Sequence, residues 1–117
     1  VPERTVFIGR LDNVVAGSAL LLRPTRNNEA QVKSVSLTTN FVAPWARGHG
    51  MARALLEEAE QEARSRNFKA INLSVRETQG AALSLYETLG FKRWGSHPKY
   101  ALVDGKTVAG HYYCKEI

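Results

Sequence analysis

Hydrophobic and polar residues alternate along the first third of the chain as they do in half-buried β-strands. Residues 5–11 and 14–23 form two such runs, and Asp12-Asn13 between them predicts a tight hairpin turn. A polar, turn-rich segment at 24–29 precedes a third run, Val32–Val42. Alternate residues of a strand share a face, so the faces predicted for this strand are Val35, Leu37, Thr39 and Phe41, and Ser34, Ser36, Thr38, Asn40 and Val42.

From Met51 the apolar spacing changes to three and four residues, which predicts an amphipathic helix that ends near Asn67. Its apolar stripe consists of Met51, Leu55, Leu56, Ala59 and Ala63. Two pairs of opposite charge four residues apart support the helix, Arg53 with Glu57 and Glu60 with Arg64.

The second half of the chain continues with a short apolar strand at 70–75 and a helix at about 79–89, with Thr78 as its expected cap. Gly90 suits the left-handed position after this helix, and Phe91 is expected to fold back on Tyr86. Strands at 92–103 and 107–115 follow, joined by a turn at Asp104-Gly105. The order β-β-β-α-β-α-β-β predicts an α/β fold with a mixed central sheet and a βαβ crossover.

Composition narrows the class of protein. The 117 residues, 44% hydrophobic and 23% charged, suit one soluble domain spanning residues 1–117. No membrane-spanning or signal segment is expected, and the single cysteine and scattered histidines predict neither a disulfide nor a metal site. A cytoplasmic location is therefore expected.

The net charge of +5 is spread along the chain, which argues against nucleic acid as a partner, although a basic nucleic-acid-binding domain stays an alternative.

Two glycines lie between the third predicted strand and the first predicted helix, in the segment Arg47-Gly48-His49-Gly50-Met51-Ala52. A helix start offers unpaired N–H groups and a partial positive charge, which suit an anionic phosphate if no side chain blocks its approach. The segment is neither a P-loop nor a GxGxxG fingerprint. A phosphate-binding turn and an ordinary flexible turn are both compatible with this fragment taken alone.

In its context the fragment resembles Q/R-x-x-G-x-G/A, the pyrophosphate-binding motif of the GNAT superfamily of N-acetyltransferases. Pro44 lies three residues before Arg47, and Val75–Phe91 is similar to the family's second signature, N-x-x-A-x-x-x-Y ending in Leu-Gly-Phe. The resemblance extends from Thr5 to the C-terminus. It implies the GNAT fold, here without the N-terminal strand and two helices usual in the family.

The resemblance also implies acetyl-CoA as cofactor and assigns residues to it. The expected cofactor contacts are Asn40, Phe41, Val42, Arg47, Gly48, His49, Gly50, Met51, Ala52, Arg53 and Gln79. Tyr86 matches the family's tyrosine that protonates the leaving thiolate, and its phenol is protonated at neutral pH. The implied reaction is direct attack by a primary amine of a small molecule or protein on the thioester.

The general base is the open question. Many family members carry a glutamate near the position of Ser36, but this strand face has only Ser34, Ser36, Thr38 and Asn40. Deprotonation through ordered water is therefore expected, with His111 or His97 as the alternative. A non-catalytic acyl-CoA-binding or sensing module is the alternative function. A homodimer is expected, because the missing elements would leave apolar surface on the sheet exposed.

Overall fold

The structure, a computed structural model, describes residues 4–23 and 34–117, without the side chains of Thr39 and Asn40. Its elements are β1 (Arg4–Leu11), β2 (Val14–Leu22), β3 (Ser34–Val42), the 3₁₀ turn η2 (Pro44–Ala46), α1 (Met51–Ser65), β4 (Ala70–Arg76), α2 (Gly80–Thr88), β5 (Lys92–Val103) and β6 (Lys106–Glu116). This order confirms the expected α/β class and the β3-α1-β4 succession of a βαβ crossover. The turn expected at 24–29 and the strand start expected at Val32 lie outside the described residues.

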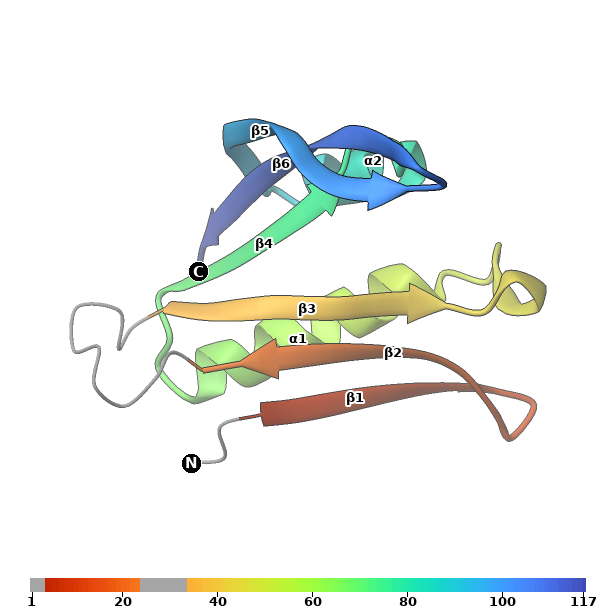
Figure 1. Ribbon diagram of the computed structural model, residues 1–117. Helices are drawn as coiled ribbons and strands as arrows, with labels where there is room; N and C mark the ends of the chain where they lie inside the picture. The colour runs from red at the N-terminus through yellow and green to blue at the C-terminus, as the bar shows by residue number, and fades with distance from the viewer. Residues whose placement is uncertain (1–3, 24–33) are drawn as a thin grey trace. The chain divides into compact units, whose positions relative to one another are not determined.

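The chain divides into two compact units, Val1–Ile71 with Ile117, and Asn72–Glu116. In the first unit, β1, β2 and β3 lie side by side in that order, and both pairs are antiparallel (Figure 1). The hairpin turn predicted between β1 and β2 is confirmed, with Asp12 and Asn13 at φ 52° and 66°. Two successive left-handed residues match the twist of the flanking strands. The expectation of one domain stays a prediction.

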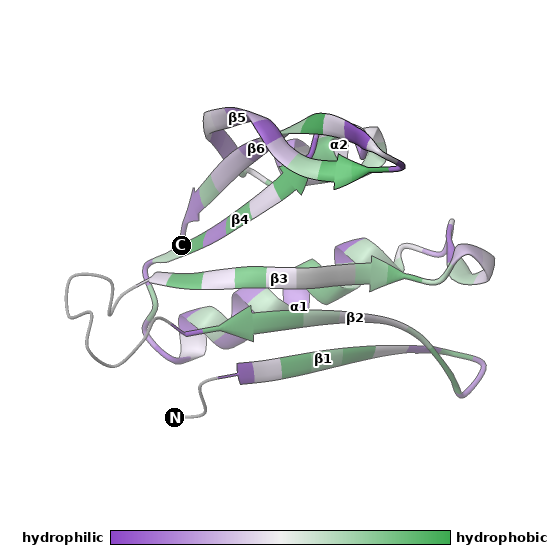
Figure 2. Ribbon diagram, viewed as in Figure 1, coloured by the Kyte–Doolittle hydropathy of each residue, from purple (hydrophilic) through white to green (hydrophobic). Residues whose placement is uncertain are grey.

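Helix α1 packs against β1, β2 and β3. Figure 2 shows hydrophobic and hydrophilic residues alternating along this helix, and the predicted stripe is buried at Leu55, Leu56, Ala59 and Ala63. Both predicted ion pairs form, Arg53–Glu57 at 2.9 Å and Glu60–Arg64 at 3.4 Å. The helix ends at Ser65, two residues before the predicted end. No helix in the described part of the chain is long and apolar enough to cross a membrane.

A β-bulge in β3 overturns part of the predicted face pattern. Ser18 pairs with Phe41, but Leu20 pairs with Thr38, so β3 has one residue more than β2 over this stretch. Before the bulge, Val35 and Leu37 are both buried, which agrees with their predicted place on one face. After it, Phe41 is 54% exposed, because an extra residue interrupts the strict alternation of a strand.

In the second unit the strands lie in the order β4-β6-β5, and β5 and β6 form the predicted hairpin (Figure 1). Its turn residues Asp104 and Gly105 have φ 51° and 77°. Gly90 is left-handed at φ 95°, and the rings of Tyr86 and Phe91 are 5.9 Å apart, as predicted. The cap prediction is wrong, because α2 has Gln79 as its N-cap residue and no side chain caps it.

Candidate functional site

The segment between β3 and α1 reverses the chain by short local hydrogen bonds. The N–H of Ala46 donates to the carbonyl of Ala43 at 2.9 Å, and that of Arg47 donates to Pro44 at 3.3 Å. Ala46 is fully buried, whereas residues 47–50 are exposed. The 3₁₀ turn η2 therefore fixes the chain just before the glycines and presents the glycine turn to solvent.

The two glycines of this turn have left-handed backbone conformations and open space around them. Gly48 and Gly50 have φ 87° and 75°, which an L side chain would strain. A Cβ built at either glycine meets no heavy atom within 4 Å. Gly50 is the N-cap of α1, no side chain caps the helix, and the first helical bond runs from Ala54 N–H to Gly50 O at 3.0 Å. The first N–H groups of α1 thus face an open approach.

The charges at this helix start favour an anion. The first turn of α1 contains no acidic residue. Arg47 and His49 are exposed on the turn, and Arg53, although paired with Glu57 at 2.9 Å, keeps an exposed side chain. Positive side chains add to the partial charge of the helix N-terminus, and both attract phosphate groups.

Met51 anchors the first turn of α1 to the sheet through two glycines that the sequence analysis missed. A Cβ at Gly9 would lie 2.8 Å from the Met51 sulfur, and one at Gly17 would lie 3.0 Å from it. Gly9 and Gly17 are cross-strand partners on β1 and β2. The missing side chains leave a gap that receives Met51, which holds the helix start in place. Paired glycines inside two adjacent strands were the available signal.

The end of β3 is tied to β2 beside this turn. Val42 pairs with Gly17, and the N–H of Ala43 donates to the carbonyl of Ala16 at 2.7 Å. Phe41 is exposed, and Asn40 lies in the bulge, with its side chain outside the described part of the structure. Asn40, Phe41 and Val42 therefore belong to the same unit as the glycine turn, as do the predicted contacts from Arg47 to Arg53.

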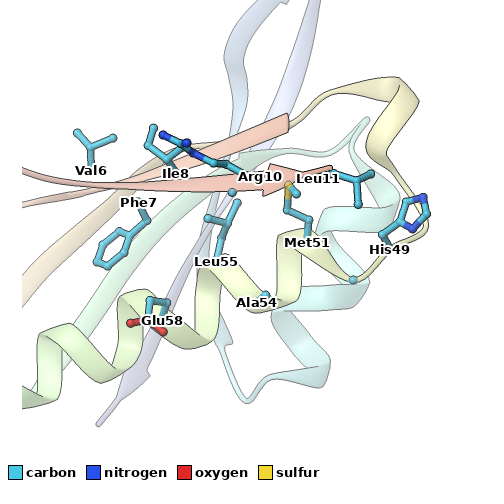
Figure 3. Close-up of a pocket in the computed structure, with 12 residues that line it drawn as sticks. Val6, Phe7, Ile8, Arg10, Leu11, His49, Met51, Ala54, Leu55 and Glu58 are labelled. Carbon is cyan, nitrogen blue, oxygen red and sulfur yellow. The ribbon is translucent and has the colours of Figure 1, made fainter. Parts of the chain in front are cut away.

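A cavity of about 540 Å³ adjoins the glycine turn (Figure 3). It lies between β1 and the first half of α1, and His49, Gly50 and Met51 line the end that the turn contributes. Phe7 and Leu55 supply apolar walls, with Arg10 and Glu58 as charged groups. Its lining residues are Val6, Phe7, Ile8, Gly9, Arg10, Leu11, His49, Gly50, Met51, Ala54, Leu55 and Glu58.

The remaining predicted site residues, Tyr86 and Gln79, lie in the second unit. Tyr86 is the buried residue of α2, and its ring packs 6.3 Å from that of Tyr113. The Tyr113 hydroxyl donates to Glu87 at 2.6 Å and accepts from Arg93 at 2.9 Å. Burial and then the bond to Glu87 raise the pKa of Tyr113, so this phenol stays protonated. Gln79 is exposed at the start of α2.

The second unit also brings together three polar side chains that sequence analysis had not grouped. Ser96 Oγ lies 2.7 Å from Nδ1 of His111, and Nε2 of His111 lies 3.7 Å from a Glu77 carboxylate oxygen. Only His111 had been considered for chemistry, as a possible base. Their sequence separation left no local signal, because Ser96 and His111 meet as partners across β5 and β6.

Comparison with known proteins decides the family. The sequence profile of the acetyltransferase (GNAT) family matches residues 1–91, well over half of the chain. The chain belongs to the acetyltransferase (GNAT) family. The GNAT resemblance predicted from the glycine turn and the second signature is thereby confirmed.

Relatives within the GNAT family agree with this assignment. An uncharacterised N-acetyltransferase from the hisH-hisA intergenic region of Azospirillum brasilense is 62% identical over 79 residues, which cover 68% of this chain and 47% of that protein. The chain thus spans about half the length of this curated relative. A ribosomal-protein-alanine N-acetyltransferase from Brucella melitensis is 27% identical with a TM-score of 0.84, covering 96% of this chain and 68% of that one.

A further solved structure shares the fold. It is YncA, a putative acetyltransferase from Salmonella typhimurium solved with its cofactor acetyl-CoA. It has a TM-score of 0.85 at 22% identity and covers 95% of this chain and 63% of its own. The expected GNAT-like fold class is confirmed by these likenesses.

Proposed function

We propose that this protein transfers an acetyl group from acetyl-CoA to a primary amine by direct attack. The observation that carries the proposal is the uncapped start of α1, where Gly48 and Gly50 leave the approach to the backbone N–H groups open. A pyrophosphate needs donors of this kind, without side chains in front of them. Family membership and a fold shared with a protein solved with acetyl-CoA support the same choice.

The residues around this helix start fit the cofactor. The N–H groups of Met51, Ala52 and Arg53 would bind the pyrophosphate, with Arg47 adding charge and His49 a further contact at the exposed turn. The end of β3, at Asn40, Phe41 and Val42, would hold the pantetheine arm, and Gln79 would add a contact from α2. Acetyl-CoA supplies an activated thioester, so orientation by these residues provides much of the rate.

Tyr86 is the proposed proton donor to the departing thiolate. A phenol is protonated at neutral pH and can donate its proton to the sulfur as the carbon–sulfur bond of the thioester breaks. Tyr86 is buried, and its ring packs 5.9 Å from that of Phe91 and 6.3 Å from that of Tyr113. The acceptor is a small-molecule or protein amine, as the name of the Brucella relative illustrates for a ribosomal protein.

The test of cofactor binding is Gly50→Glu. The new carboxylate would repel phosphate at the helix start, and we expect acetyl-CoA affinity measured by calorimetry to fall about tenfold or more, which is about 1.4 kcal/mol. Gly105→Glu is the matched control, because Gly105 has φ 77° against 75° for Gly50 and equally open space. It carries the same backbone strain and charge in the β5–β6 turn, so its affinity should match the wild type.

Two outcomes would count against the proposal. Unchanged affinity in Gly50→Glu would remove the glycine turn from the cofactor site. Normal acetyl-CoA binding without thiol release in the presence of any primary amine would favour the alternative, a non-catalytic acyl-CoA-binding module.

The proposal also includes the oligomeric state of the protein and its cellular compartment. We propose a homodimer of single-domain chains in the cytoplasm. Four exposed apolar side chains on the β1–β2 hairpin favour burial against another chain, namely Val6, Ile8, Val14 and Val15. The free Cys114 suits a reducing compartment. Light scattering at tens of micromolar, roughly the range of weak interfaces, tests the dimer, and a monomer there would contradict it.

A further inference from the structure

His111 is the buried polar residue among the described residues, with 6% of its surface exposed. Burying an imidazole is costly unless its nitrogens have partners. Both nitrogens face one here: Ser96 Oγ at 2.7 Å from Nδ1, and a Glu77 carboxylate oxygen at 3.7 Å from Nε2. Ser96 is hydrogen-bonded to the ring, the Glu77 carboxylate lies beyond hydrogen-bonding distance, and both of these residues are exposed to solvent.

The fold presents Ser96 by two irregularities in β5. Arg93 pairs with Tyr113 and Gly95 with Tyr112, which leaves one extra β5 residue at this point. Beyond Ser96 the register shifts again, between His97 and Ala101. Bulges are common at sheet edges, where β5 lies, and beside active sites, and they can re-aim a side chain. The Ser96–His111 pair, which forms the hydrogen bond, lies in the short regular stretch between the two irregularities.

The third member, Glu77, is held by its backbone. Its N–H donates to the carbonyl of Ala109 on β6 at 2.9 Å, which places it beside His111 while its side chain stays 63% exposed. Two other charged groups contact β6 two residues further along, at Tyr113. Glu87 from α2 and Arg93 from β5 are both hydrogen-bonded to the Tyr113 hydroxyl. Glu77 is thus the carboxylate that faces the imidazole.

We infer that Ser96, His111 and Glu77 form the path by which the acceptor amine loses its proton. This inference rests on the proposed acetyl transfer. An ammonium at the Ser96 hydroxyl passes one proton to Oγ while the hydroxyl proton moves to Nδ1 of His111. The acceptor becomes a neutral amine and His111 an imidazolium, which the Glu77 carboxylate stabilises. The imidazolium then releases its Nε2 proton to water beside Glu77, which leaves the Nδ1–H tautomer. Exchange with water, one proton lost from Nδ1 through the Ser96 hydroxyl and one gained at Nε2, restores the starting tautomer.

The chemistry of the three groups suits this task. A neutral imidazole accepts a proton at the ring nitrogen that carries none, and Nδ1 of His111 is the nitrogen that lies 2.7 Å from the Ser96 hydroxyl. The Glu77 carboxylate, 3.7 Å from Nε2, attracts the positive charge that the ring carries after it has accepted the proton. The path also supplies the base that the β3 face of Ser34, Ser36 and Thr38 lacks, without relying on water alone.

The experiment compares two acceptor probes of different basicity at pH 6 to 10. One is a peptide whose only amine is its N-terminus, with a pKa near 7.7–8.0, and the other is an N-acetylated peptide with one lysine, near 10.4. At pH 7 roughly one α-amine in ten but fewer than one lysine in a thousand is neutral. Turnover is followed as release of the thiol of coenzyme A.

We expect His111→Gln to lower kcat for the lysine probe by about 10²-fold at pH 7, the usual contribution of a general base. The loss should be smaller for the α-amine probe and should shrink as the pH rises toward 10. The variant rate should rise toward the pKa of the lysine probe, because only the neutral fraction of that amine then reacts, and the wild-type rate should depend less steeply on pH. Ser96→Ala should behave similarly, Ser96→Thr should restore activity, and KM for acetyl-CoA should not change.

His97→Gln is the matched control, because His97 is an exposed histidine on β5 that accepts the N–H of Lys99 at 3.0 Å. Its rates should equal the wild-type rates. If the wild type is active and both His111→Gln and Ser96→Ala keep its pH profile, this inference is wrong and the proposed function stands. If acetyl-CoA binds but the wild type acetylates neither probe nor any small primary amine, the proposed function and this inference both fail.

Discussion

Gly17 is the position where a single methyl group should disturb both stability and cofactor binding. A Cβ there would lie 2.8 Å from the carbonyl oxygen of Phe41 and 3.0 Å from the sulfur of Met51. The first contact is with backbone, which can move only if β3 moves away from β2. We therefore expect Gly17→Ala to displace the end of β3, where the structure places Phe41 and Val42.

The magnitude follows from two opposing effects. Overpacking of a filled interior typically costs about 1–3 kcal/mol. Replacing glycine in a strand returns about 0.5–1 kcal/mol, because alanine has less conformational entropy to lose on folding. A net loss of about 1–2 kcal/mol in unfolding free energy results, which is roughly 4–8 °C in Tm for a domain of this size.

Gly9→Ala is the matched variant. Its Cβ would lie 2.8 Å from the Met51 sulfur and 3.3 Å from the terminal methyl, but near no backbone atom among its nearest neighbours. The thioether end of methionine is flexible and can turn aside, so the net change should be within about 0.5 kcal/mol of zero.

Urea unfolding of both variants, alone and combined with Met51→Ala, separates the two contacts. Removing the Met51 side chain should abolish any cost of Gly9→Ala but should relieve Gly17→Ala only in part, since the Phe41 carbonyl remains. Acetyl-CoA affinity should fall in Gly17→Ala and not in Gly9→Ala. Equal stability losses in the two variants, or complete relief of Gly17→Ala by Met51→Ala, would refute the role given to the Phe41 carbonyl.

Three further outcomes follow from the second unit. Tyr86→Phe should lower kcat by about 10²-fold with little change in acetyl-CoA affinity, since a general acid contributes about that much; full activity would exclude Tyr86 as the proton donor. Burial and the bond to Glu87 raise the pKa of Tyr113 from 10.0, so the folded state resists deprotonation of this phenol. The contribution of Tyr113 to the free energy of unfolding should therefore be fully present below about pH 10 and be lost as the pH rises above it. Urea unfolding at several pH values tests this, and the Tyr113→Phe variant should not show the decrease. Burial, and after it Glu116, raises the pKa of Cys114, so iodoacetamide should alkylate the folded protein more slowly than the urea-unfolded chain at neutral pH, and equal rates would contradict this.

The sequence alone determined those features that depend on neighbouring residues. The two hairpin turns, the stripe of α1 and its ion pairs, and the left-handed Gly90 formed where predicted. Local sterics and side-chain period decide them, and neither needs knowledge of distant partners. The glycine turn belongs to this group as well, because the positive φ of Gly48 and Gly50 follows from what only glycine adopts easily.

Tertiary structure decided the features that depend on register between strands. An extra residue in β3 exposed Phe41 against the predicted alternation, and the pairing of Gly9 with Gly17 made room for Met51. Ser96 meets His111 only because the bulged β5 aligns with β6 in one register. A shift of one residue moves every later side chain to the other face, and only the packing of the whole unit selects among registers. The glycine turn is therefore predictable from the sequence, whereas the surroundings of His111 are not.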